Sequence, residues 1–145
     1  MSITSSYESW NQVDDSLYIG DLFAISDPLI RRSIGTIISM IKVQQTTMIP
    51  RHVIHIEMPI DDSMDQSLRE VAPLAYKHIM NSVKEGRRVL VHCHAGKSRS
   101  AAIVIYYLMN RYGKSFEDAL AYLKLRRPGI NPNMGFCIQL ANLSV

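Results

Sequence analysis

The sequence predicts an α/β fold, with a central, mostly parallel sheet of about four to five strands and helices on both faces. Short segments rich in β-branched and aromatic residues alternate with longer segments in which apolar residues recur every three to four positions. Such alternation is typical of parallel strands joined by helical crossovers. The chain, residues 1–145, is expected to form a single domain, with residues 1–15 as an N-terminal extension.

Several segments have the composition of strands. Parts of the second and fourth segments are continuous apolar runs, which is the pattern of strands covered on both faces. The predicted strands are 17–20, 36–41, 52–58 and 88–92.

The first predicted helix, residues 67–84, opens with the sequence Ser67-Leu-Arg-Glu, which is typical of a capping box. Pro73 lies inside this pattern. Because an interior proline costs about 3 kcal/mol, we expect the helix either to kink there or to begin nearer Ala72.

Three further helices are predicted in the second half of the chain. One covers about 98–112 and ends at Gly113. The next runs to residue 125 after a cap at Ser115, and the last begins near Asn133.

The composition excludes several functional classes. No run of eighteen apolar residues occurs and the first residues lack a secretory pattern, so we expect a cytoplasmic or nuclear location without membrane insertion. The formal net charge is +3, but the basic residues are scattered, so nucleic acid is not an expected partner. Cys93 and Cys137 are too few for a disulfide framework and are expected to be thiols.

The segment VHCHAGKSRS, residues 91–100, joins a predicted strand to a predicted helix. Ligands of α/β sheets bind at such junctions, and backbone N–H groups that lead into a helix form an anion cradle. Gly96 allows the tight curvature, and the guanidinium of Arg99 matches phosphate oxygens. The residues expected to bind phosphate are His94, Ala95, Gly96, Lys97, Ser98 and Arg99.

Cys93 is expected at the floor of this cradle. The helix dipole, the backbone amides and Arg99 all favour negative charge there, which predicts a nucleophilic thiolate and phosphoryl transfer to sulfur. An inert buried thiol fits the polar, cationic neighbourhood less well. A metal site on His92, Cys93 and His94 would need further ligands, so we expect no metal and no cofactor.

The motif Cys, five residues, Arg, Ser is the signature of the cysteine-dependent protein tyrosine phosphatase superfamily, and HCHAGKSRS resembles it. The segments LYIGD, MPIDDSMDQ and YYLMNRYGKSFEDALAYLKLRRPGINPNMGFCIQL narrow the resemblance to the dual-specificity phosphatases, of the small type with a catalytic domain only. Similarity extends from about Ser16 to Leu143.

The resemblance implies roles for individual residues. Cys93 matches the nucleophile, Arg99 the group that holds the transition state, and Ser100 the hydroxyl that hydrogen-bonds the sulfur. His92 matches the residue that organises the loop and helps to keep the thiolate charged. Asn133 either braces the phosphate loop or only caps a helix.

The reaction also needs a carboxylic acid to protonate the leaving oxygen. Alignment through Pro59 and a spacing of thirty-one positions to Cys93 favours Asp62. Some family members have the acid thirty-two positions before the cysteine, which would select Asp61. Asp65 is a weaker third candidate.

The expected substrates are proteins that carry phosphotyrosine and phosphoserine or phosphothreonine. His94 and Lys97 resemble the basic loops of phosphoinositide phosphatases, so phosphoinositides or an RNA 5′-phosphate are the alternative. A non-catalytic phosphoprotein-binding module is less favoured, because both Cys93 and Arg99 are present. Arg126 and Arg127 either attract anionic substrates or form a solvated helix end. The oligomeric state is left open.

Overall fold

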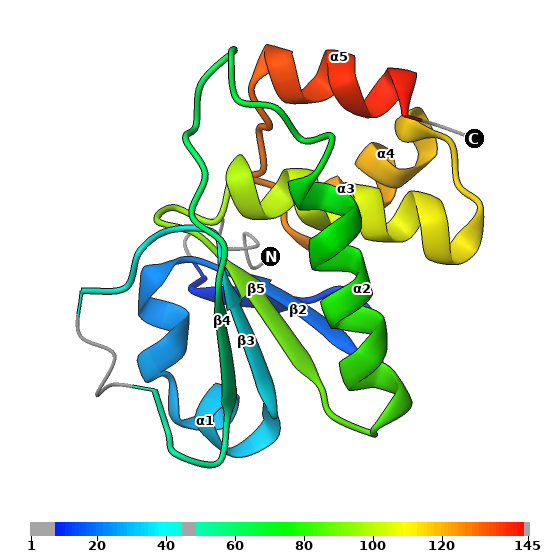
Figure 1. The fold of residues 1–145 in the computed structure, drawn as a ribbon. Coiled ribbons are helices and arrows are strands. Elements are labelled where there is room, and N and C mark those ends of the chain that lie inside the picture. Colours follow the sequence, from blue (N-terminus) through cyan, green and yellow to red (C-terminus); the bar gives the residue numbers. More distant parts are fainter. Residues whose placement is uncertain (1–7, 45–48, 144–145) are drawn as a thin grey trace, which may run out of the picture.

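The computed structural model describes residues 8–44 and 49–143. Its centre is a five-stranded sheet in which β1 is antiparallel to β2 and all other neighbouring strands are parallel (Figure 1). The predicted fold class is therefore confirmed. In sheet order the strands are β1 (Trp10–Gln12), β2 (Leu17–Gly20), β5 (Val89–His92), β3 (Thr36–Ser39) and β4 (Ile54–Glu57).

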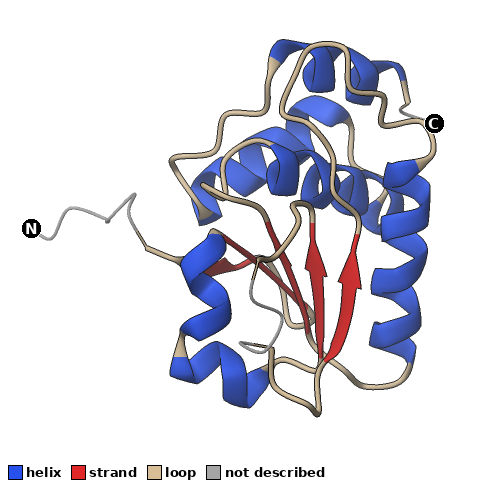
Figure 2. Ribbon diagram, turned by 60° about the vertical axis from the view of Figure 1, so that its left-hand side comes forward, coloured by secondary structure: helices blue, strands red, loops and turns tan. Residues whose placement is uncertain are grey.

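Helices cover both faces of the sheet, as predicted (Figure 2). Alternate residues of the strands divide the core in two: Ile19, Ile38 and Val91 belong to the larger apolar cluster, whereas Tyr18, Ile37 and Leu90 belong to the smaller one. The smaller cluster packs under η1 (Leu22–Ser26) and α1 (Pro28–Ser33). The larger one packs under α2 (Val71–Lys84), α3 (Arg99–Tyr112), α4 (Phe116–Arg126) and α5 (Met134–Asn142).

The sequence patterns miss three short elements: β1, η1 and α1. Although β1 falls within the predicted N-terminal extension, it pairs with β2 at the edge of the sheet. These elements span three, five and six residues, too few for a hydrophobic period to be recognised. The sequence does contain cap signals for η1 and α1, because aspartate is a preferred N-cap residue and proline a preferred first residue of a helix. In the structure Asp21 and Asp27 each accept two backbone N–H groups, and Pro28 begins α1.

The first long helix begins later than the capping box predicts. Its N-cap residue, Glu70, makes no side-chain capping bond, and the Ser67 hydroxyl accepts only the N–H of Arg69. Because α2 begins at Val71, Pro73 lies in the first turn, where an N–H would have no partner inside the helix. Of the two outcomes expected from Pro73, the later start is confirmed.

The boundaries of the remaining helices agree with their predicted caps. Gly113 ends α3 with a φ of 68°, in the left-handed region. The side chains of Ser115 and Asn133 accept the backbone N–H groups of Asp118 and Phe136 at the starts of α4 and α5. Within residues 8–44 and 49–143, no helix is both long and apolar enough to cross a membrane.

Candidate active site

The predicted phosphate cradle lies at the carboxyl edge of the parallel strands, between β5 and α3 (Figure 1). Cys93 follows the last residue of β5, and α3 begins at Arg99. The loop of residues 93–98 between them is anchored to the sheet, since the Cys93 N–H donates to the carbonyl of Gly20 at 3.3 Å. The topology thus brings the thiol, the loop and the start of α3 to one point.

Gly96 is required by both the conformation and the packing of this loop. Its φ of 68° is one that residues with a side chain rarely adopt. A Cβ at this position would lie 2.7 Å from Nη2 of Arg127 and 2.8 Å from the backbone of Gly20. The loop therefore packs against its neighbours through a bare backbone.

The carbonyls of the loop are held by the surrounding protein. In a trans peptide, the N–H of the next residue points away from the carbonyl of the same unit. With their carbonyls engaged by the core, the loop amides are free to face a bound anion, as the cradle requires. The carbonyls of Cys93, His94, Gly96 and Lys97 pair respectively with His92 Nδ1, Leu22 N, Arg127 Nε and Asn131 N, at 3.2, 3.0, 2.8 and 2.7 Å.

Cys93 lies at the floor of a cavity of about 250 Å³. Its side chain is nearly buried, and its Sγ lies 3.1 Å from the hydroxyl oxygen of Ser100. When the sulfur is a thiolate, the Ser100 hydroxyl must be the donor of this bond. The cavity is lined by Asp62, Cys93, Ala95, Lys97, Ser98, Arg99 and Asn131.

The structure separates the candidate acids. Asp62 lines the cavity, and its Oδ1 accepts hydrogen bonds from the Ser98 hydroxyl at 2.6 Å and from Asn133 Nδ2 at 2.9 Å. All three carboxylates are exposed, but Asp61 and Asp65 do not line the cavity. The backbone N–H of Asp61 is instead bonded to Gln66 Oε1 at 2.8 Å. The geometry therefore favours Asp62.

Asn133 has both of the roles that the sequence left open. Its Oδ1 accepts the N–H of Phe136 and so caps α5. Its Nδ2 donates to Asp62, and its backbone N–H donates to the Ser98 hydroxyl at 3.0 Å. The same side chain therefore caps α5 and contacts Asp62, because the cap brings the amide beside that carboxylate.

Among the remaining predicted residues, Arg99 is half-buried and its Nη1 donates to the carbonyl of Ile60 at 3.4 Å. That contact joins the guanidinium to the loop that carries Asp62. His94 and Lys97 are exposed, so both can meet a substrate at the rim. Among the described residues, no group of three or more His, Cys, Asp or Glu side chains could hold a metal ion.

His92 acts on the cradle from beneath, through a hydrogen-bond chain that the sequence did not reveal. Its Nδ1 faces the Cys93 carbonyl, which only accepts, so Nδ1 carries the proton. Its Nε2 then accepts from the Ser39 hydroxyl at 2.6 Å, and Ser39 Oγ accepts from His55 Nε2 at 2.8 Å. Burial lowers the pKa of His92 to about 4, so it is neutral at pH 7 and works through hydrogen bonds. Ser39 was the sequence signal for this chain of hydrogen bonds, because a polar residue inside a buried strand needs a hydrogen-bond partner.

This lowered pKa predicts acid sensitivity of the fold. The unfolded chain protonates His92 near its ordinary pKa of about 6.5, whereas the folded protein resists protonation down to about pH 4. The unfolded state therefore binds more protons in this interval, and the free energy of unfolding should fall by about 3 kcal/mol between pH 7 and pH 4. Urea denaturation across this range measures the loss. NMR titration of the His92 ring checks its source, and a midpoint near 6.5 would refute the assignment.

Arg127 is a residue of the site whose surroundings differ from both sequence-based expectations. It is 4% exposed, so it neither attracts substrates nor forms a solvated helix end. Besides the Gly96 carbonyl, it holds the carbonyl of Glu8 at 2.8 Å and Oδ1 of Asn11 at 2.7 Å through Nη1. Burial lowers the pKa of its guanidinium, while the charges of Asp21 and Cys93 oppose this shift.

Arg127 could have been recognised by helical spacing. It follows Leu123 by four positions, as Leu123 follows Ala119, and both of those residues are fully buried. Arg126 is exposed and stacks on the ring of Tyr122, 5.4 Å from its centroid, as expected for a solvated helix end. Arg127 thus ties the edge strand β1 to the back of the phosphate cradle.

Comparisons with known proteins agree with this geometry. The family model "Dual specificity phosphatase, catalytic domain" matches residues 17–144. Dual specificity protein phosphatase 1 of Arabidopsis thaliana is 31% identical over 134 residues, which cover 90% of this chain and 67% of that protein. The serine/threonine/tyrosine-interacting protein of Mus musculus is 42% identical over 86 residues, 59% of this chain and 39% of that protein.

Solved structures show the same fold. The crystal structure of DUSP15 superimposes with a TM-score of 0.86 at 30% identity, covering 93% of this chain and 86% of the other. The similarity therefore extends over nearly all of this chain. With the family model covering nearly all of the described residues, the chain belongs to the dual-specificity phosphatases, a family of cysteine-dependent protein phosphatases.

Proposed function

We propose that this chain hydrolyses phosphotyrosine and phosphoserine or phosphothreonine in proteins through a cysteinyl-phosphate intermediate. The observation that carries the proposal is the cavity in which the Cys93 sulfur at the floor meets Arg99 and Asp62 in the walls. A nucleophile, an anion clamp and an acid within one small cavity are what phosphoryl transfer to sulfur requires.

In the first step the Cys93 thiolate attacks phosphorus. A sulfur–phosphorus bond forms and the bond from phosphorus to the substrate oxygen breaks. The loop amides and the Arg99 guanidinium hold the other phosphate oxygens in the transition state. Asp62 gives its proton to the leaving oxygen. Because Oδ1 of Asp62 already accepts two hydrogen bonds, Oδ2 is the atom that carries this proton.

In the second step water replaces the sulfur. Asp62, now a carboxylate, takes a proton from the water that attacks phosphorus, and the sulfur–phosphorus bond breaks. The Ser100 hydroxyl, 3.1 Å from Sγ, stabilises the departing thiolate by donating a hydrogen bond. Free phosphate leaves, and the enzyme returns to its starting state with a protonated Asp62.

Dual specificity is supported by the relative from Arabidopsis thaliana, whose name states it. The sequence also lacks the tyrosine-recognition segment that deepens the pocket in strictly tyrosine-specific enzymes. The single domain, the cytoplasmic or nuclear location and the absence of nucleic-acid partners stay predictions of the sequence.

The experiment is phosphate release by the reduced protein from peptides of one sequence that carry phosphotyrosine or phosphothreonine. We expect turnover of both peptides, unaffected by a chelator. A soluble phosphoinositide and a 5′-triphosphorylated RNA serve as the competing substrates. A preference for either of them by more than about tenfold in kcat/KM would contradict the proposal and assign the exposed Lys97 to substrate selection. Stoichiometric peptide binding without release would indicate a binding module.

A further inference from the structure

A second cavity, of about 610 Å³, opens beside the catalytic one. We call it the apolar hollow. Ile25 and Val43, both buried, form its floor, and Leu22, Phe23 and Ile41 also line it. At its inner edge it reaches His94 and Arg99. Arg99 borders both cavities, so the hollow adjoins the place where a substrate phosphate would be held.

Phe23 is the most exposed of the apolar side chains that line the hollow. It is an aromatic residue on η1 and yet is 71% exposed. An aromatic ring exposed to water keeps apolar surface that a ligand could cover, and covering that surface favours binding. The ring thus supplies one wall for an apolar group that enters the hollow.

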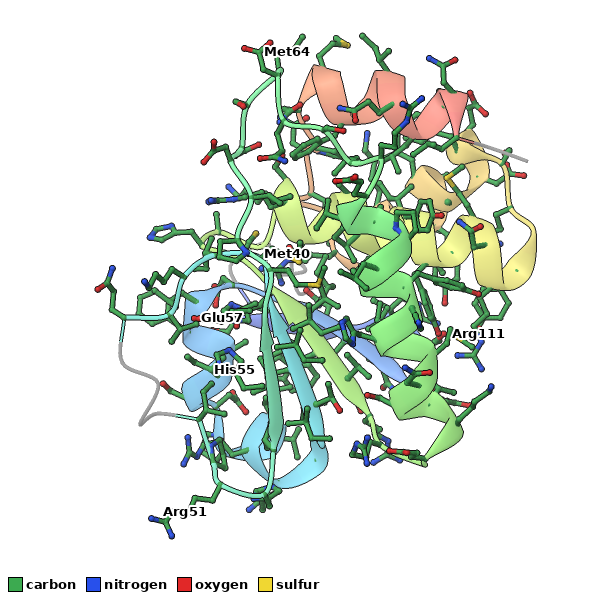
Figure 3. All side chains as sticks on the ribbon, viewed as in Figure 1. Met40, Arg51, His55, Glu57, Met64 and Arg111 are labelled. Atoms are coloured by element: carbon green, nitrogen blue, oxygen red, sulfur yellow. The ribbon has the colours of Figure 1, made fainter. Side chains whose placement is uncertain are left out.

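Both walls are built on the protein core. On one side, the side chain of Asp21 accepts the backbone N–H of Phe23 at 2.9 Å, and the N–H of Leu22 is tied to the cradle. On the other side, the N–H of Met40 donates to the His92 carbonyl at 2.9 Å and that of Val43 to Glu57 Oε2 at 2.7 Å. Met40 directly follows β3, and Glu57 is the last residue of β4 (Figure 3). These bonds make the hollow a preformed site.

We propose that the apolar hollow binds an apolar side chain of the phosphoprotein substrate, one to three positions from the phosphorylated residue. This inference rests on the proposed function. An extended peptide advances about 3.3 Å per residue, so a chain anchored by its phosphate beside Arg99 carries a neighbouring side chain over the hollow. A volume of about 610 Å³ admits a leucine or phenylalanine side chain, which buries against Phe23 and Ile41.

The test is a set of phosphopeptides in which each of the three positions on either side of the phosphoresidue is leucine or alanine in turn. At one position we expect leucine to raise kcat/KM about tenfold over alanine, the discrimination typical of an apolar pocket. The effect should lie mainly in KM, because the hollow binds substrate and transition state equally. In Phe23→Ala the leucine-to-alanine ratio should fall to about one or two.

Leu125→Ala is the matched control. Leu125 is 84% exposed on α4 and does not line the hollow, so this variant should keep the tenfold ratio. A ratio near one at every position in the wild type, with peptides still turned over, would overturn the inference and leave the proposed function intact. The same holds if Phe23→Ala keeps the ratio.

Two other results would overturn the inference in different ways. If no phosphopeptide is turned over, the proposed function and the inference fail together. If a short-chain phosphoinositide is preferred over its headgroup alone, and Phe23→Ala removes that preference while peptides show none, the hollow binds acyl chains instead of a peptide side chain.

Discussion

Replacing Cys93 with serine is expected to abolish phosphate release, lowering kcat by about ten-thousandfold or more. A serine hydroxyl is a much weaker nucleophile than a cysteine sulfur, so the attack on phosphorus should be lost. The exchange of sulfur for oxygen is small, and Ser100 remains available as a hydrogen-bond partner. Steady-state phosphate release from a phosphotyrosine peptide measures the effect.

Cys137→Ser is the matched control, because this half-buried thiol lies on α5 and does not line the catalytic cavity. It should keep full activity. Binding of the phosphopeptide by Cys93→Ser shows that the variant is folded and that its cradle is intact. Residual turnover above about a tenth of the wild-type rate in Cys93→Ser would refute the role of Cys93 as nucleophile.

Asp62→Asn is expected to lower kcat by about a hundred- to a thousandfold. The asparagine keeps an oxygen that can accept hydrogen bonds from Ser98 and Asn133. A fall in kcat therefore reports the missing proton donor and not a change in structure. Steady-state phosphate release from the phosphothreonine peptide measures the loss, and a rate within about threefold of the wild type would contradict the role of Asp62 as the acid.

The leaving group provides an independent check on Asp62. An alkoxide from phosphothreonine needs a proton more than an activated aryl oxide does, so Asp62→Asn should impair the peptide far more than an activated aryl phosphate. Asp61→Asn, one position away and outside the cavity, should retain the wild-type rate on both substrates. If Asp61→Asn instead impairs the peptide far more than the aryl phosphate, the acid is Asp61.

Much of the fold follows from local patterns. The strands 17–20 and 88–92 and the caps at Ser115 and Asn133 were recognised because each signal lies within a few residues of its partner. The same reasoning was wrong at Ser67, where a capping-box sequence precedes a helix that begins at Val71. There the chain is held by tertiary contacts, since the N–H of Leu68 donates to Gln139 Oε1 at 2.7 Å.

The sequence by itself determined the α/β class and predicted the nucleophile and the cradle, because Cys93 to Ser100 is one continuous segment whose spacing carries its chemistry. Only the tertiary structure decided what surrounds that segment. Asp62 and Ser98 are 36 positions apart and Asn11 and Arg127 are 116 apart, so their contacts depend on how the sheet and helices pack. No local pattern encodes such a pairing, because an aspartate in a loop or an arginine at a helix end looks the same whether the fold buries it or leaves it in water.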